Sequence, residues 1–219
     1  MIHVNQAPEP KDFNRKVRQP GLRAIAELVG ERPLPKRRGR PRAKIAERRE
    51  DIPAAEFPDF WTRAIDDMLV AYGRICAYMC VFIEPVTGVP TVDHMLPKSM
   101  VWELVYEWAN YRLACSLVNT WKGDVLYVLD PFHVETGWFE LELVGFQLKA
   151  NDKLQPNISA LVNRTITRLR LNDKQCRDLR EYYSAEYWTG RITHEHLQSR
   201  APFIAMELRR QGRLREVDT

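Results

Sequence analysis

The stretch Val92-Asp93-His94-Met95-Leu96-Pro97-Lys98-Ser99 decides how this chain of 219 residues folds. Upstream of it, the β-rich residues 81–83 and 91–92 flank a loop that contains Pro and Gly, which predicts a β-hairpin ending at His94. Downstream, residues 112–122 have the pattern of a helix that stops at Gly123. Residues 100–109 fit either a short helix or an irregular apolar segment. The order hairpin, loop and helix indicates a small α+β module.

Helices and further strands surround this module. Helical spacing predicts a helix from Pro58 to Tyr72, closed by Gly73. Two strands are expected at 125–129 and 138–148, followed by three helices near 157–170, 173–188 and 193–211. The fold class is therefore α+β, with a C-terminal helical bundle and a basic N-terminal arm. The expected boundaries are 1–50 for the arm or linker, 51–150 for the central module and 151–219 for the helical region.

The net charge of +4 is unevenly distributed along the chain. Residues 32–49 hold nine basic side chains and only Glu47 as an acid, a net +8, so the rest of the chain carries −4. Such dense like charge with few apolar residues predicts that this segment is a flexible arm. Before it, residues 21–29 have the spacing of a short amphipathic helix. The arm contains Arg-Gly-Arg-Pro at 38–41, which resembles an AT-hook that binds the DNA minor groove. General attraction to polyanions and a plain solvated linker are the alternatives. The candidate contacts are Arg37, Arg38, Arg40 and Arg42.

Chemically competent side chains gather after the predicted hairpin. Asp93 and His94 end its second strand, Asn110 follows 16 residues after His94, and Asn119 lies nine residues further on. A neutral imidazole suits a general base, and a carboxylate with an amide carbonyl suits Mg²⁺ or Mn²⁺. Taken singly, each residue has an ordinary structural explanation as a capping or surface side chain. Together, at these spacings, they indicate a site.

This order of residues resembles the HNH, or ββα-metal, nuclease motif. The matching segments are 92–99, Trp108–Cys115 and Asn119–Asp124. The resemblance implies a metal-dependent endonuclease in which His94 is the general base and Asn110 braces the loop and orients His94. It implies that Asp93 and Asn119 are the metal ligands. Lys98 and Lys122 are then candidate contacts to nucleic acid.

Further segments are similar to HNH proteins encoded beside an ATPase in bacterial anti-phage systems of the Septu and retron-associated type. They include Ile75–Tyr78, Ile83–Gly88 and Leu129–Phe132, and the similarity covers roughly residues 72–150. It implies an antiviral effector gated by an ATPase partner. We expect the nucleic acid that it binds to be DNA rather than RNA. The alternative is a module that binds nucleic acid or assembles with partners without catalysis. No run of apolar residues suits a membrane span or a signal peptide, so we expect a cytoplasmic protein.

The four cysteines bear on a structural zinc, which many HNH proteins hold with two CxxC pairs. Cys76 and Cys115 stand at the first position of each pair, but the second positions are Met79 and Val118. We therefore expect an apolar cluster and no structural zinc. A degenerate site that uses Cys76, Cys80, Cys115 and a distant ligand such as His133 is the alternative. Cys176 is expected to be packed in a helix.

The last predicted helix combines apolar and basic residues between 200 and 215. It suits an amphipathic helix that closes the bundle, and a docking face or a phosphate-facing strip are the alternatives. In the same region, His194 and His196 are two positions apart, so they do not face each other on a helix and make a poor metal pair.

Overall fold

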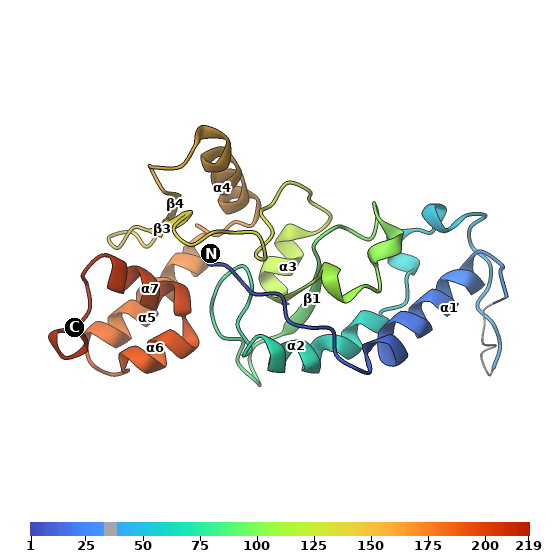
Figure 1. Cartoon of the computed structure of the whole chain (residues 1–219), viewed down its shortest axis with the longest axis horizontal. Coiled ribbons are helices and arrows are strands. Elements are labelled where there is room, and N and C mark those ends of the chain that lie inside the picture. Colours follow the sequence, from blue (N-terminus) through green and yellow to red (C-terminus); the bar gives the residue numbers. More distant parts are fainter. Residues whose placement is uncertain (33–38) are drawn as a thin grey trace.

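The computed structural model describes residues 1–32 and 39–219. The molecule is elongated: helix α1 (Gln19–Leu28) lies at one end, the C-terminal helices lie at the other, and the predicted central module lies between them (Figure 1). This arrangement of helices and small sheets confirms the α+β class.

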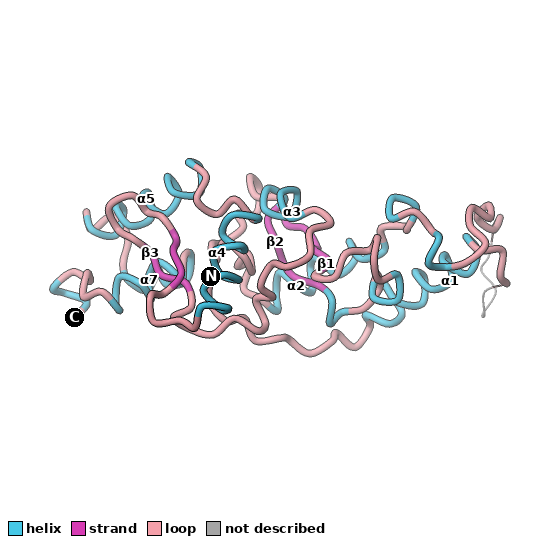
Figure 2. Tube along the Cα trace, turned by 90° about the horizontal axis from the view of Figure 1, so that it is seen from above, coloured by secondary structure: helices cyan, strands magenta, loops and turns pink. Residues whose placement is uncertain are grey.

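The central module is an antiparallel strand pair followed by a helix. Strand β1 (Pro90–His94) pairs with β2 (Tyr111–Cys115) so that His94 lies opposite Tyr111. Helix α3 (Ser116–Lys122) begins directly after β2, and the strands and the helix lie together in the middle of the molecule (Figure 2). The loop between the strands runs over residues 95–110 and contains two short 3₁₀ helices, η5 (Trp102–Leu104) and η6 (Trp108–Asn110).

Two predictions about this module are wrong in detail. The strand partner of β1 is β2, whereas Phe82 of the predicted first strand makes only an isolated bridge to Ile75. The predicted helix over 112–122 is a strand up to Cys115 and a helix from Ser116. Residues 111–114 are all buried, and a short apolar run buried on both faces has no period that separates a strand from a helix.

The N-terminal region is part of the core. A π-helix (η1, Asn14–Arg18) leads into α1, and Phe13, Val17 and Ile25 are buried, although the sequence predicts an arm over residues 1–50. Leu22, an apolar residue of the predicted amphipathic helix over 21–29, is 43% exposed. Gly21 packs against the ring of Tyr106 so closely that a Cβ would lie 2.2 Å from it, so only glycine fits there.

The basic segment after residue 38 folds back along α1. The amide of Ile45 donates to the carbonyl of Leu28 at 2.8 Å, and three arginines form ion pairs with acids of the chain. These pairs are Arg42 with Glu27, Arg48 with Asp51 and Arg49 with Glu31. Most of the arm's charge in residues 39–49 is thus held at the surface of the body. Arg37 and Arg38 lie outside the described residues.

Residues 1–7 form an extended strap that runs from the C-terminal part of the molecule past the central module (Figure 1). The amide of Val4 donates to Pro131, and the indole of Trp108 donates to the carbonyl of Ala7 at 2.8 Å. Met1 is 2% exposed, and its amino group lies within electrostatic reach of Arg180 and Glu207.

The predicted helix over 58–72 is confirmed in extent. It consists of a 3₁₀ helix, η4 (Phe60–Ala64), followed by α2 (Ile65–Ala71), and two short 3₁₀ turns precede it at Arg49–Asp51 (η2) and Ala54–Glu56 (η3). Figure 1 shows α2 beneath β1.

The chain after α3 contains a small hairpin and four α-helices. Strands β3 (Phe139–Leu141) and β4 (Leu148–Ala150) are antiparallel, so the predicted strand over 138–148 contains a turn, and residues 125–129 form no strand. The turn is stabilised by Glu142, whose carboxylate accepts from the amides of Val144 and Gly145. Helices α4 (Pro156–Arg168) and α5 (Lys174–Trp188) match their predictions.

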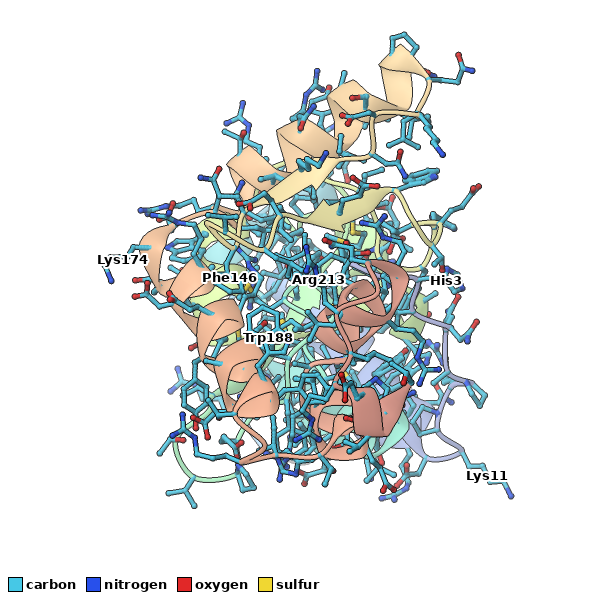
Figure 3. All side chains as sticks on the ribbon, turned by 90° about the vertical axis from the view of Figure 1, so that its left-hand side faces the viewer. His3, Lys11, Phe146, Lys174, Trp188 and Arg213 are labelled. Carbon is cyan, nitrogen blue, oxygen red and sulfur yellow. The ribbon has the colours of Figure 1, made fainter. Side chains whose placement is uncertain are left out.

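The last predicted helix is interrupted. It divides into α6 (His194–Arg200) and α7 (Pro202–Arg210) because Pro202 lacks an amide hydrogen and opens a new helix, and a 3₁₀ turn (η7, Glu216–Asp218) follows. At this end of the molecule Trp188 packs beside Phe146 and donates to the carbonyl of Arg213 at 3.1 Å (Figure 3). Phe203, Ile204 and Leu208 of α7 are buried, which agrees with a helix that closes the bundle.

Within the described residues, every helix falls short of the length and apolar character needed to cross a lipid bilayer.

Candidate active site

A cavity of about 200 Å³ opens where β1 ends and α3 ends, and we call it the β1–α3 cavity. The strands and helix of the central module meet here, so residues distant in sequence line one hollow. The lining residues are Val92, Asp93, His94, Pro97, Lys98, Asn119, Gly123 and Asp124. Four of the residues predicted from the sequence are therefore brought together: Asp93, His94, Lys98 and Asn119.

The imidazole of His94 is held on three sides. Its ring packs edge-on against Trp61, at 5.0 Å between centroids, and against Tyr111 at 5.2 Å. Its Nε2 lies 2.9 Å from the carbonyl oxygen of Val105. Because a carbonyl only accepts hydrogen bonds, Nε2 carries the hydrogen, and Nδ1 is the nitrogen with a free lone pair in the neutral ring. Nδ1 makes no hydrogen bond with another residue that the structure describes.

The charge state of His94 follows from its surroundings. Burial lowers the pKa of His94 to about 4; the Val105 carbonyl raises it, and the cations of Lys98 and Lys122 lower it further. At neutral pH the ring is therefore uncharged, and Nδ1 can accept a hydrogen bond from a water molecule.

Asn110 forms hydrogen bonds across the loop between β1 and β2. Its Oδ1 accepts from the amide of Leu96 at 2.8 Å, and its Nδ2 donates to the carbonyls of Leu96 at 3.0 Å and Leu104 at 3.2 Å. Leu104 precedes Val105, whose carbonyl also accepts from the hydroxyl of Tyr111 at 2.8 Å. Asn110 does not touch His94; it braces the loop that supplies the hydrogen-bond partner of His94.

Two side chains of α3 attach the helix to β1. Nδ2 of Asn119 donates to Oγ1 of Thr91 at 3.1 Å, and one turn later Nζ of Lys122 donates to Oδ1 of Asp93 at 2.9 Å and to the carbonyl of His94 at 2.8 Å. The side chain of Lys122 is 0% exposed. The prediction that Lys122 contacts nucleic acid is therefore wrong, because its ammonium is buried in the module.

Asp93 is a buried carboxylate with both oxygens bonded. Lys122 donates to Oδ1, and the hydroxyl of Tyr78 donates to Oδ2. Burial raises the pKa of Asp93 above its ordinary value, although the neighbouring ammonium of Lys122 opposes this shift. Asp93 was predicted to be a metal ligand, whereas the structure makes it the partner of Lys122 and Tyr78.

The side of the cavity that faces solvent is formed by Lys98 and Asp124. The Lys98 ammonium lies 4.2 Å from the ring centroid of Trp61 and the side chain is half-buried. Burial lowers the pKa of Lys98, and the carboxylates of Asp124 and Asp59 act against this shift. Lys98 thus presents a cation at the cavity that carries His94.

The donor groups around the cavity can be compared with the needs of a divalent cation. Asn119 Oδ1 takes no hydrogen bond from a described residue, and Asp124 is exposed, whereas Asp93 is already bonded and has an ammonium beside it. In the part of the chain that the structure describes, no three His, Cys, Asp or Glu side chains gather as a metal site. Asn119 and Asp124 carry amide and carboxylate oxygens, which are ligand types that Mg²⁺ and Mn²⁺ accept. Asp93, with Lys122 and Tyr78 bonded to its two oxygens, does not fit the predicted role of metal ligand beside Asn119.

None of the four cysteines lines the β1–α3 cavity. Sγ of Cys76 is 3.9 Å from Sγ of Cys115, so the first positions of the two half-lost pairs do meet. Val118, at one of the lost second positions, is buried, and Met79 packs against the same core. Cys176 is buried with its Sγ 3.7 Å from Sδ of Met79.

Sequence analysis missed several residues of the site. Trp61 lies in the predicted helix over 58–72 and Val105 in the segment 100–109, and neither was singled out. Tyr78 and Asp124 were included only as members of segments that resemble HNH proteins. Each of them acts through contacts made by the folded chain, and no local sequence signal marks such contacts.

No protein-family model matches this chain, and a search of curated proteins finds no match. The arrangement of side chains around the β1–α3 cavity therefore carries the assignment of function.

Proposed function

We propose that this protein is an HNH-type endonuclease that hydrolyses phosphodiester bonds of nucleic acid, with His94 as the general base. The observation that carries the proposal is the state of His94: a neutral ring, fixed through Nε2 to Val105, lines a cavity that also presents a cation. A buried imidazole whose free nitrogen is Nδ1 is suited to taking a proton from an attacking water. The order of elements, strand, loop, strand and helix, supports the ββα reading of the motif.

Each residue of the proposed site has a separate role in hydrolysis. Nδ1 of His94 takes the proton of the water that attacks phosphorus, the bond from phosphorus to the leaving sugar oxygen breaks, and that oxygen takes a proton from solvent. Lys98 offsets the negative charge of the phosphate. Asn110 is a positioning residue, because it fixes the loop that holds Val105. Asn119 and Asp124 would hold Mg²⁺ or Mn²⁺, which supplies Lewis-acid stabilisation of the phosphate when bound.

The test is cleavage of supercoiled plasmid and of RNA with Mg²⁺ or Mn²⁺, comparing the wild type with His94→Asn. We expect a loss of about 10²–10⁴-fold, the usual contribution of a general base. His196→Ala is the matched control, since His196 is exposed on α6. Full activity of His94→Asn, or no cleavage by the wild type alone and with its partners, would refute the proposal. DNA is the expected substrate.

A second candidate function is supported by the bonds of Asp93. Because Lys122 and Tyr78 occupy both of its oxygens, the module also suits a nucleic-acid-binding role without catalysis. In that case wild type and His94→Asn bind a DNA duplex equally and neither cuts it.

The resemblance to anti-phage HNH proteins leads us to propose an ATPase partner that gates the nuclease in a defence system. Copurification with the products of neighbouring genes tests this directly. A chain that elutes alone under native expression, and cuts without a trigger, would contradict the gating partner.

A further inference from the structure

A second hollow, of about 240 Å³, lies at the α1 end of the molecule, and we call it the arginine pocket. Its lining comes from three segments: α1, the basic segment after residue 38, and η4. The lining residues are Pro20, Arg23, Ala24, Arg42, Phe60 and Arg63. Three guanidinium groups therefore surround one small hollow.

The ring of Phe60 holds two of the arginines. The guanidinium carbon of Arg63 lies 4.5 Å from the ring centroid, and that of Arg42 lies 5.8 Å from it. Such cation–π contacts fix the plane of a guanidinium without consuming its positive charge. The pocket is thus a positioned cluster of cations around an aromatic floor.

The charges of the pocket are only partly neutralised by the chain. Arg42 is 3.5 Å from Glu27, whereas Arg23 donates to the carbonyl of Gln19 and Arg63 donates to the carbonyl of Lys16. A carbonyl orients a guanidinium but carries no net charge. Bringing three like charges together costs electrostatic energy, which an anionic ligand would recover.

Helix η4 lines the pocket and also contacts two residues that line the β1–α3 cavity. In a 3₁₀ helix residues three apart lie on the same side, so Phe60 and Arg63 face the pocket together while Trp61 points elsewhere. Trp61 is the residue that packs on His94 and beneath Lys98. The ring of Tyr106 lies 6.2 Å from that of Phe60 and 6.1 Å from that of Trp61, and it connects the two places.

We propose that the arginine pocket binds a backbone phosphate of the nucleic acid whose scissile bond lies at His94. This inference rests on the proposed function and names the surface that holds the substrate beside the site. A phosphodiester suits the pocket because guanidinium forks match phosphate oxygens. Folding of the basic segment onto α1 delivers Arg42 to this ligand, so the segment contributes a fixed contact.

The experiment measures binding without cleavage. A fluorescein-labelled DNA duplex is titrated with His94→Asn protein in EDTA across a salt series, and the pocket variant carries Arg23→Ala and Arg63→Ala in addition. We expect at least a tenfold loss of affinity and a salt slope that is shallower by about one, as for one lost phosphate contact. The control carries Arg168→Ala and Arg209→Ala, which remove the same charge from exposed positions on α4 and α7 at the other end of the molecule (Figure 1).

The outcomes separate the two proposals. Equal affinity and equal slope for the pocket and control variants overturn the pocket, whatever the cleavage assay shows. A selective loss of binding in the pocket variant supports the pocket even if the wild type never cuts nucleic acid, in which case only the nuclease proposal fails. If a poly-glutamate peptide competes as well as the duplex, the ligand is an acidic protein segment and the phosphate assignment is overturned. Equal melting temperatures of the variants exclude unfolding as the cause of a loss of affinity. Phe60→Leu keeps all charges but removes the ring that positions Arg42 and Arg63, so it must also weaken binding.

Discussion

Lys122 and Asp93 form a buried ion pair in which Nζ lies 2.9 Å from Oδ1, joining the last turn of α3 to the end of β1. Their side chains are 0% and 3% exposed. The same ammonium donates to the carbonyl of His94, so one lysine holds both residues of the Asp-His pair. This relationship makes the geometry of the site depend on a charge that never meets solvent.

Removing Lys122 should therefore be costly. Lys122→Met leaves the Asp93 carboxylate buried without its cation, and we expect a loss of about 3–5 kcal/mol in the free energy of unfolding. Urea denaturation followed by circular dichroism measures it. Lys153→Met, at an exposed position, is the control and should change stability little. The double variant Lys122→Met with Asp93→Asn should recover part of the loss, and a double variant as unstable as the sum of both single variants would contradict the pairing.

The buried neutral state of His94 predicts a dependence of stability on pH. The folded pKa is about 4 and the unfolded value is 6.5, so between these values the unfolded chain binds a proton that the folded chain does not. The free energy of unfolding of the metal-free protein should therefore fall as the pH falls through this window, by up to about 3 kcal/mol. His94→Gln keeps a donor for Val105 but does not titrate, so its stability should fall less. An identical pH profile for both proteins would show that His94 is not the group responsible.

Asn110 should control the order of the loop. Asn110→Ala removes the acceptor of the Leu96 amide and the donor to Leu104, so the exchange of the Leu96 amide hydrogen should accelerate at least tenfold. Hydrogen exchange by NMR or mass spectrometry reports this, with Asn163→Ala on the exposed side of α4 as the control. Unchanged protection across residues 95–105 would remove Asn110 from its bracing role. With a cleavable substrate, kcat should fall more than KM rises.

Cys115 should be the most reactive thiol. The hydrogen bond from Cys76 and the backbone amides at the start of α3 lower the pKa of Cys115 to about 7 despite partial burial, whereas burial raises the pKa of Cys76. Alkylation by iodoacetamide, located by mass spectrometry, should modify Cys115 first, with a rate midpoint near pH 7. Cys76→Ala should move that midpoint upward. Preferential modification of Cys176 would contradict this order.

Much of the fold was readable from the sequence because long amphipathic segments have a clear period. α4 and α5 match their predicted ranges, and the helix over 58–72 is present with a 3₁₀ start. The pairing of β1 was misassigned, since a neighbouring β-rich segment across a Pro/Gly loop looks like a hairpin partner. The true partner begins 17 residues after His94 and is identified only by the long-range register of His94 with Tyr111.

Part of the candidate site could be predicted because its residues have a recognisable spacing in the sequence. Motif spacing placed His94, Asn119 and Lys98 on one cavity, and the bracing role of Asn110 follows from the loop it closes. Spacing does not report burial, so Lys122 was taken for a surface cation. Nor does it report contacts between elements, so the packing of Trp61 on His94 was not foreseen.

The path of residues 1–7 has a consequence for the order of folding during synthesis. His3 bonds the carbonyl of Val134, 131 positions later, and Ala7 accepts from Trp108, 101 positions later. These partners leave the ribosome long after the strap does, whereas the local turns of α1 form as soon as they are made. The strap is therefore placed only after residues 108–134 have been synthesised. Until then, His3 and Ala7 lack the hydrogen-bond partners Val134 and Trp108 that they have in the folded protein.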